Sequence, residues 1–231
     1  MQGVPLEDVP WCAMDGILII NKPAGITSHD VVDKVREKFH IRRVGHAGTL
    51  DPMATGVLVM LIGRATKLAG SFIEDDKEYI ATLSLGKRTD TQDATGKVVE
   101  EMPVDGLAVS RVKEVLDSFK GPIEQVPPMM SAKKYKGKKL YQLARKGKSV
   151  ARKPCRINIH EIEILDFKLP EIIFRVRCSK GTYVRTLCED MGRTMGYPAH
   201  MSSLTRIRSG RFSLVEACDL DNVNEKDIQS L

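Results

Sequence analysis

The residues best suited to chemistry lie in one short stretch, 45–56, with the sequence GHAGTLDPMATG. This stretch combines three glycines with one histidine and one carboxylate, Asp51. Glycines at this density allow sharp turns and a close approach of the backbone to a ligand. Pro52 fixes its own φ and biases Asp51 towards an extended conformation. Taken alone, such a loop is more often a surface turn stabilised by its aspartate, so the pattern leaves two interpretations open.

A second stretch, residues 133–153, carries ten Lys or Arg residues and no Asp or Glu. Since the whole chain has a net charge of +6, this segment alone makes the protein basic. Two tyrosines and two leucines interrupt the charges: Tyr135, Leu140, Tyr141 and Leu143. Charge blocks are often only solvated surface. Because cations contact phosphates and aromatic rings stack on bases, this interleaved pattern favours nucleic-acid binding.

The composition is that of a soluble globular protein, with 231 residues, 42% hydrophobic and 29% charged. No apolar run approaches the roughly 20 residues that span a bilayer, so no membrane association is expected. The N-terminus lacks the features of a signal peptide, which predicts a cytoplasmic protein. The five cysteines are scattered without a C-x-x-C pair, which predicts reduced core residues and neither disulfides nor a zinc site.

Apolar periodicity predicts the elements that position these stretches. Strands are expected at 15–21, 57–62, 78–86, 157–167, 172–178 and, as a pair or one bulged strand, within 204–214. Helices are expected at 30–39 with Ser28 as cap, 65–72, 110–120 with a capped start, 140–146, 183–195 closed by Gly196, and in the acidic C-terminal tail. Because these elements mix without a regular βαβ repeat, the predicted fold is α+β, with a mixed, largely antiparallel central sheet flanked by helices and loops.

Two further patterns narrow the chemistry. The polar run at 87–96 (KRTDTQDATG) could hold a metal, but it lacks the ligand spacing of an EF-hand, which favours a hydrogen-bonded loop. The chain has no G-x-G-x-x-G and no Walker loop, which disfavours dinucleotide and nucleotide-triphosphate chemistry.

Seven separated motifs identify a family resemblance. They are NKPxGxTS at 21–28, GHxGxLDPxATG at 45–56, KxY at 77–79, LGxxTDTxDxxG at 85–96, PPxxSAxK at 127–134, CSKGTYVR at 178–185 and AHxxxLxR at 199–206. In this order and register, they resemble the TruB family, the bacterial synthases that form pseudouridine 55 in tRNA. The resemblance spans approximately residues 15–220 and implies a pseudouridine synthase fold.

The resemblance implies that uracil at one position of the tRNA T-loop is detached from its ribose, rotated and rejoined through C5. Since no redox or phosphoryl step is involved, no cofactor and no metal are expected. The family assigns the catalytic carboxylate to the residue that is Asp51 here. Arg185 matches the arginine that pairs with this carboxylate, and Tyr79 matches a catalytic tyrosine that also contacts the base.

Four further residues match the substrate-binding set of the family. Tyr183 matches the second tyrosine at the target base, His46 matches a histidine associated with base flipping, and Leu204 matches an apolar wall of the pocket. Lys22 lies in a motif near the active site, mainly as support for the catalytic loop. By pattern alone, Tyr183, Arg185 and Leu204 also fit ordinary helix-start, surface and core positions.

The basic stretch matches an insertion, about 122–155, with which the family grips the T-stem loop of tRNA. Its expected RNA-binding residues are Lys133, Lys134, Lys136, Lys138 and Arg145. Several phosphate contacts there would make binding fall steeply with salt concentration. The expected partner is therefore tRNA. No membrane association and no obligate protein partner are expected, and the protein is expected to be a monomer.

The resemblance predicts a tail at 1–14, a catalytic domain at 15–220 and a second tail at 221–231. TruB-type enzymes commonly add a small C-terminal PUA-like RNA-binding domain, which this sequence does not show. Two alternatives stay open: a non-catalytic T-loop binder or tRNA folding chaperone, and a guide-RNA-dependent synthase that works within a complex. Intact Asp51, Arg185 and Tyr79 disfavour the first alternative, and the short C-terminus disfavours the second.

Overall fold

The structure is a computed structural model that describes residues 14–231. The chain forms two compact units, the first from residues 14–77 with 205–231 and the second from residues 78–204. The predicted N-terminal tail lies outside the described residues apart from Met14, and so does Cys12. Strand β12 (Ala199–Ser209) contributes its first part to the second unit and its last part to the first.

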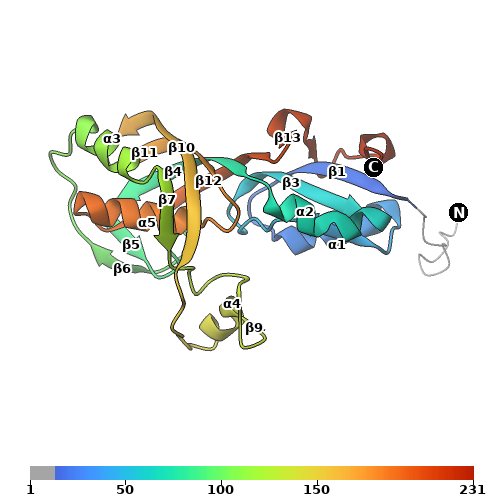
Figure 1. Cartoon of the computed structure of the whole chain (residues 1–231), viewed down its shortest axis with the longest axis horizontal. Coiled ribbons are helices and arrows are strands. Elements are labelled where there is room, and N and C mark those ends of the chain that lie inside the picture. The colour runs from blue at the N-terminus through green and yellow to red at the C-terminus, as the bar shows by residue number, and fades with distance from the viewer. Residues whose placement is uncertain (1–13) are drawn as a thin grey trace, which may run out of the picture. The chain divides into compact units, whose positions relative to one another are not determined.

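The first unit is built around one strand, β3 (Thr55–Ile62), shown in Figure 1. Strand β3 pairs antiparallel with β1 (Gly16–Lys22) and with β2 (Val44–Ala47), and parallel with the last part of β12. The remaining elements of this unit are α1 (Ser28–Phe39), η2 (Gly63–Leu68), α2 (Ala69–Glu74), β13 (Phe212–Ser213), η3 (Leu214–Glu216), β14 (Cys218–Asp219) and η4 (Glu225–Asp227). Its sheet therefore has the mixed strand directions that were predicted.

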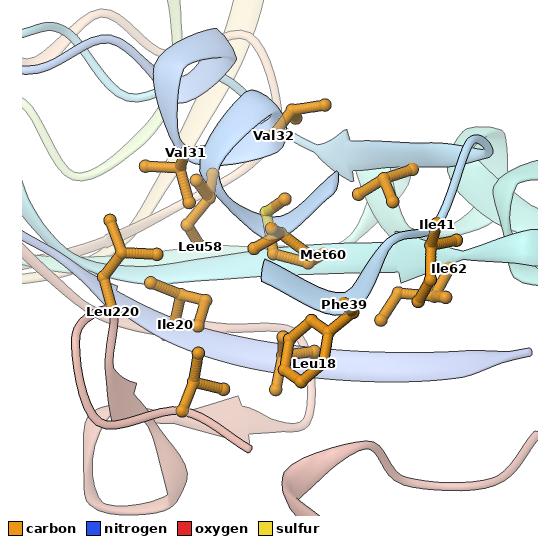
Figure 2. Packing of buried hydrophobic residues seen from close by; sticks show 13 residues of the cluster. Leu18, Ile20, Val31, Val32, Phe39, Ile41, Leu58, Met60, Ile62 and Leu220 are labelled. Carbon is orange, nitrogen blue, oxygen red and sulfur yellow. The ribbon is translucent and has the colours of Figure 1, made fainter. Parts of the chain in front are cut away.

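The apolar run of β3 is buried on both faces of this sheet, as its sequence predicts. Leu58 and Met60 belong to a cluster with Val31 of α1, which Figure 2 shows. Val57 and Val59 belong to a second cluster. Because successive side chains of a strand point to opposite faces, an uninterrupted apolar run needs a core on each side. Each fully buried aliphatic side chain stabilises the fold by about 1.5–3 kcal/mol.

The cap of helix α1 lies one residue earlier than predicted. Thr27, not Ser28, is the cap residue: its hydroxyl accepts a hydrogen bond from Asp30 N at 3.1 Å, and the Asp30 carboxylate accepts one from Thr27 N at 2.7 Å. This reciprocal arrangement satisfies two backbone donors at the helix start. The hydroxyl of Ser28 is thereby left for a long-range contact.

The second unit is a sheet with the strand order β12-β4-β11-β10-β7, in which β7, β10 and β11 are antiparallel neighbours. Helix α3 packs against β10 and α5. The element bounds are β4 (Lys77–Leu85), β5 (Lys87–Thr89), β6 (Val98–Glu101), α3 (Val109–Ser118), β7 (Gly121–Gln125), β8 (Lys134–Tyr135), β9 (Lys138–Lys139), α4 (Leu140–Ala144), β10 (Cys155–Lys168), β11 (Glu171–Cys178) and α5 (Val184–Met195). Figure 1 shows the β8–α4 segment beyond the ends of β7 and β10.

Most predicted elements are confirmed, and the α+β fold class with them. Helix α5 ends at Gly196 with φ 90°, the left-handed cap that was predicted. Three details are wrong: α3 begins after Ala108 with no side-chain cap, the helix at 65–72 splits into η2 and α2, and the C-terminal helix is only the three-residue turn η4. None of the described helices is both long and apolar enough to cross a membrane.

Candidate active site

The loop that carries Asp51 connects two paired strands, β2 and β3. Gly45, His46 and Ala47 belong to β2, where His46 lies opposite Met60 of β3. Strand β2 is not apparent in the sequence because it is short and contains a glycine. Because β2 and β3 are paired, both ends of the loop that joins them are fixed. Asp51 lies on this loop and is half-buried.

Lys22, the last residue of β1, contacts this loop through its side chain. Its side chain is fully buried, and Nζ donates to the carbonyls of Pro23 and Ile26, each at 2.7 Å, and of Pro52 at 3.2 Å. Burial lowers the pKa of Lys22 from 10.5 to about 8, and the negative charge of Asp51 partly opposes this lowering. The Lys22 ammonium therefore connects the turn that follows β1 to Pro52 of the 45–56 loop.

Ser28 supplies a second attachment. Its hydroxyl donates to the carbonyl of Leu50 at 3.1 Å and accepts from Leu50 N at 2.9 Å. Gly25 N adds a third contact, to the carbonyl of Pro52 at 2.9 Å. The residues on either side of Asp51 are thus fixed through their backbone groups.

Arg206 of β12 supplies the attachment from the C-terminal part of the chain. It is 1% exposed, and its guanidinium donates to Val57 O at 2.7 Å and to Gly48 O at 3.1 Å. Gly56 packs against the backbone of the same residue: with φ +100°, a Cβ here would lie 2.2 Å from Arg206 O. Arg206 stands in the last sequence motif, but no local pattern indicates that it contacts the 45–56 loop.

In the second unit, Arg185 of α5 lies among polar groups in a buried site. Its side chain is 4% exposed, Nη2 donates to Met130 O at 2.5 Å, and Nη1 lies 3.8 Å from the carboxylate of Asp93, which is 7% exposed. The other carboxylate oxygen of Asp93 accepts from Thr91 Oγ1, Thr95 N and Thr95 Oγ1 at 2.6–2.9 Å. The carboxylate of Asp93 therefore has donors from Thr91 and Thr95 in addition to its ion pair with Arg185.

The sequence assigned no site role to Asp93, the residue that pairs with Arg185. It lies in the TDTQD run, which the sequence predicts to be a hydrogen-bonded loop, and its contacts confirm that prediction. No three His, Cys, Asp or Glu side chains within 14–231 are grouped so that they could hold a metal ion. The sequence signal for Asp93 is that it is the second of two carboxylates in the polar run 87–96. The pairing of Arg185 with Asp51 remains a prediction.

The two tyrosines differ in setting. Tyr79 lies on β4 and is 8% exposed, whereas Tyr183 is half-buried at the residue before α5. The backbone of Tyr183 is fixed by Gln125, which donates to Tyr183 O at 3.1 Å and accepts from Tyr183 N at 2.8 Å. The guanidinium of Arg185 lies 5.8 Å from the centre of the Tyr183 ring, close enough for a cation–π contact. Leu204 on β12 is 7% exposed, which fits an apolar pocket wall and an ordinary core position alike.

All five residues expected to bind RNA are exposed: Lys133, Lys134, Lys136, Lys138 and Arg145. They lie around the short hairpin β8–β9 and helix α4. Two cations lie near the ring of Tyr141, with Lys139 Nζ 5.7 Å and the Arg145 guanidinium 5.3 Å from its centre. This surface offers charge and aromatic rings to a nucleic acid.

The sequence matches two family models that together cover most of the described chain. The model for the N-terminal domain of TruB family pseudouridylate synthases matches residues 36–184. The model for the C-terminal domain of tRNA pseudouridylate synthase B matches residues 185–229. The chain belongs to the TruB family.

Named TruB relatives are similar over nearly all of this chain. The tRNA pseudouridine synthase B of Protochlamydia amoebophila is 50% identical over 206 residues, which are 89% of this chain and 78% of that protein. The tRNA pseudouridine synthase B of Syntrophotalea carbinolica is 48% identical over 210 residues, which are 91% of this chain and 69% of that protein.

A solved Cbf5–Nop10–Gar1 complex contains a chain similar in fold to this TruB-family protein. It matches with a TM-score of 0.73 and 28% identity, covering 93% of this chain but only 60% of that one. In the TruB-family chain described here, the one carboxylate of the 45–56 loop lies beside backbone groups fixed by Lys22, Ser28 and Arg206. A carboxylate on so constrained a loop is suited to act as a nucleophile or as a base.

Proposed function

We propose that this TruB-family enzyme is a tRNA pseudouridine synthase that isomerises uridine 55 of the T-loop, with Asp51 as catalytic residue. The observation that carries the proposal is the attachment of the Asp51 loop to buried Lys22, Ser28 and Arg206. A preorganised carboxylate needs no rearrangement when charge develops on the substrate. Two named relatives that are 48% and 50% identical support tRNA as the substrate.

The reaction exchanges one bond for another within a single nucleotide. The bond between N1 of uracil and C1′ of ribose breaks, the base rotates, and a bond between C5 and C1′ forms. The proton on C5 is lost and N1 gains one, so atoms balance without a cofactor. Asp51 begins the exchange, either by attacking C1′ or by removing a proton from the ribose.

The other site residues recognise the flipped nucleotide. Tyr79 and Tyr183 offer rings for stacking and phenols for hydrogen bonding to the base. Leu204 packs against the base, His46 contacts the nucleotide as it leaves the stack, and Arg185 supplies positive charge near the carboxylate of Asp51. Asp93 keeps Arg185 in place, and Lys22 keeps the loop in place. Unstacking a nucleotide costs a few kcal/mol, which contacts of the basic segment 133–153 offset.

The enzyme acts alone in the cytoplasm, as a monomer on the T-stem loop of tRNA. The test is therefore to incubate the purified protein, without partners, with an unmodified T-stem-loop RNA and to map pseudouridine. We expect modification at the position of uridine 55. Binding without modification would instead support a non-catalytic T-loop binder, and activity that appears only with added guide RNA would support a guide-dependent enzyme.

Replacing Asp51 tests the assigned role. Asp51→Asn should lower the single-turnover rate by at least about 10²-fold, while RNA affinity stays within a few-fold. Asp221→Asn, the same substitution at an exposed position of the same unit, is the matched control and should keep wild-type activity. Retained pseudouridine formation in the Asp51 variant would remove it from the mechanism.

A further inference from the structure

A basic pocket lies in the first unit, where neither the reaction nor the basic segment 133–153 uses it. It is open, with a volume of about 630 Å³. Its lining residues are Arg36, Arg42, Arg43, Val44, Gly45 and Thr66. Pockets of this size accommodate small ligands or parts of larger ones. Among the described residues, three guanidinium groups and no carboxylate line it, so the ligand that fits is an anion.

One of the three arginines is fixed in place. Arg36 Nη2 donates to Val44 O at 3.0 Å, and Nη1 pairs with Asp33 at 3.0 Å. The remaining side-chain nitrogen, Nε, is buried without a hydrogen-bond partner among the described residues. Since the guanidinium is held by two contacts, an anion bound beside it needs little further ordering of this side chain.

The other two arginines carry charge that no acidic residue of 14–231 neutralises by direct contact. Arg42 and Arg43 are exposed, and no carboxylate of the described residues forms an ion pair with either. The charge of Arg43 acts on the carboxylate of Asp15, but Asp15 is itself paired with Arg64. The Thr66 hydroxyl donates to Gly63 O, so the donors available to a ligand are the guanidiniums.

We propose that this pocket binds a backbone phosphate of the RNA substrate, at a contact separate from the basic segment. This inference rests on the proposed function, in which the substrate is RNA. Arginine matches phosphate oxygens through paired N–H donors better than any other side chain. Val44 and Gly45 precede His46 in β2, so a phosphate bound here lies within one short strand of the start of the Asp51 loop.

The test is the salt dependence of T-stem-loop RNA binding by Arg42→Gln/Arg43→Gln. We expect affinity to fall and the slope of log Kd against log salt to decrease by about 1–2, because fewer counterions are released. The matched control is Arg111→Gln/Arg193→Gln, which removes two exposed arginines from helices α3 and α5 of the second unit. Its slope should stay at the wild-type value. Thermal unfolding checks that both variants are folded.

A titration with inorganic phosphate distinguishes the source of the anion. An unchanged RNA salt slope together with saturable phosphate binding, lost in the variant, would assign the pocket to a free anion and overturn the RNA contact. An unchanged slope without phosphate binding would overturn the proposal altogether. Pseudouridine formation by the wild-type protein is scored separately, so failure of the proposed reaction is distinguishable from failure of this contact.

Discussion

The loop at 45–56 and the basic segment at 133–153 are held in opposite ways. The loop is fixed by side chains that are almost completely buried: Lys22 is 0%, Arg206 1% and Ser28 2% exposed. Along the basic segment, all of which is described, Leu140 is the only buried side chain. Its cations contact neighbouring rings and Cys155, whose Sγ lies 2.5 Å from Lys133 Nζ, and Arg152 donates to the carbonyl of Pro127 at 3.2 Å.

This difference separates two tasks. A reacting carboxylate must be held close to its productive geometry, which requires buried hydrogen bonds from several elements. Phosphate contacts tolerate mobile side chains because the attraction is long-ranged and depends little on angle. Substitutions around the loop should therefore lower stability and rate together, whereas substitutions in the segment should lower affinity and leave the fold unchanged.

The largest effect is expected for Gly56→Ala. Its Cβ would lie 2.2 Å from Arg206 O on a backbone with φ +100°, which should lower the free energy of unfolding by about 2–4 kcal/mol. Gly25→Ala is the control: φ is +88°, but no atom of the described residues beyond the adjoining ones lies within 4 Å of the added Cβ, so only the strain of about 1–2 kcal/mol remains. Urea unfolding measures both. Equal losses would show that the contact with Arg206 does not hold the loop.

Lys22→Met should have a smaller, pH-dependent effect. Three carbonyls lose their donor, which should lower the free energy of unfolding at pH 7 by about 1–3 kcal/mol. The folded wild type releases the Lys22 proton near pH 8, whereas the unfolded chain keeps it up to its ordinary pKa of 10.5. The unfolded state then binds more protons, so wild-type stability relative to the variant rises with pH from 8 to 10.5.

Urea unfolding at pH 7, 8, 9 and 10 measures this difference. Lys34→Met, on the exposed side of α1, is the control and should show no such pH trend. A constant gap between the wild type and the Lys22 variant would mean that the Lys22 pKa is not lowered by burial.

The smallest effect on stability is expected in the basic segment. Neutralising its first four lysines to Gln (Lys133, Lys134, Lys136 and Lys138) should shift the midpoint of thermal unfolding little, because all four are exposed. RNA affinity should fall, the salt slope should decrease by about 1–3, and saturating RNA should restore turnover. An unchanged slope would show that the segment does not contact phosphate.

A control for this variant removes the same charge elsewhere. It replaces four exposed lysines outside the segment with Gln: Lys34, Lys97, Lys113 and Lys168. An equal loss of RNA affinity in this control would mean that net charge, and not the segment, determines binding.

The sequence predicted elements well where a local pattern decides them. The apolar run of β3, the alternation of β10 and β11, and Gly196 at the end of α5 all act over a few residues. The boundaries therefore fell close to those observed. The helix predicted for the acidic C-terminal tail failed because its apolar residues serve tertiary packing instead: Val223 is 1% exposed in the core of the first unit.

Contacts between residues that are far apart in the sequence could not be predicted. Thr27 and Ser28 are both cap-forming residues by type, and only the contact of Ser28 with Leu50 explains why the second hydroxyl is there. Arg206 and Asp93 could not be assigned roles for the same reason, since a buried charge has no local signature. The family resemblance named Asp51 and the residues around it, but not the groups that hold the loop.

The order of the chain has a consequence for how this enzyme is made. The unit that carries Asp51 combines residues 14–77 with 205–231, while the other unit is one continuous stretch. A ribosome releases the chain from its N-terminus, so the Asp51 loop emerges more than 150 residues before Arg206, its partner through Gly48 and Val57. The Asp51 loop is therefore among the first segments synthesised and among the last to be completed.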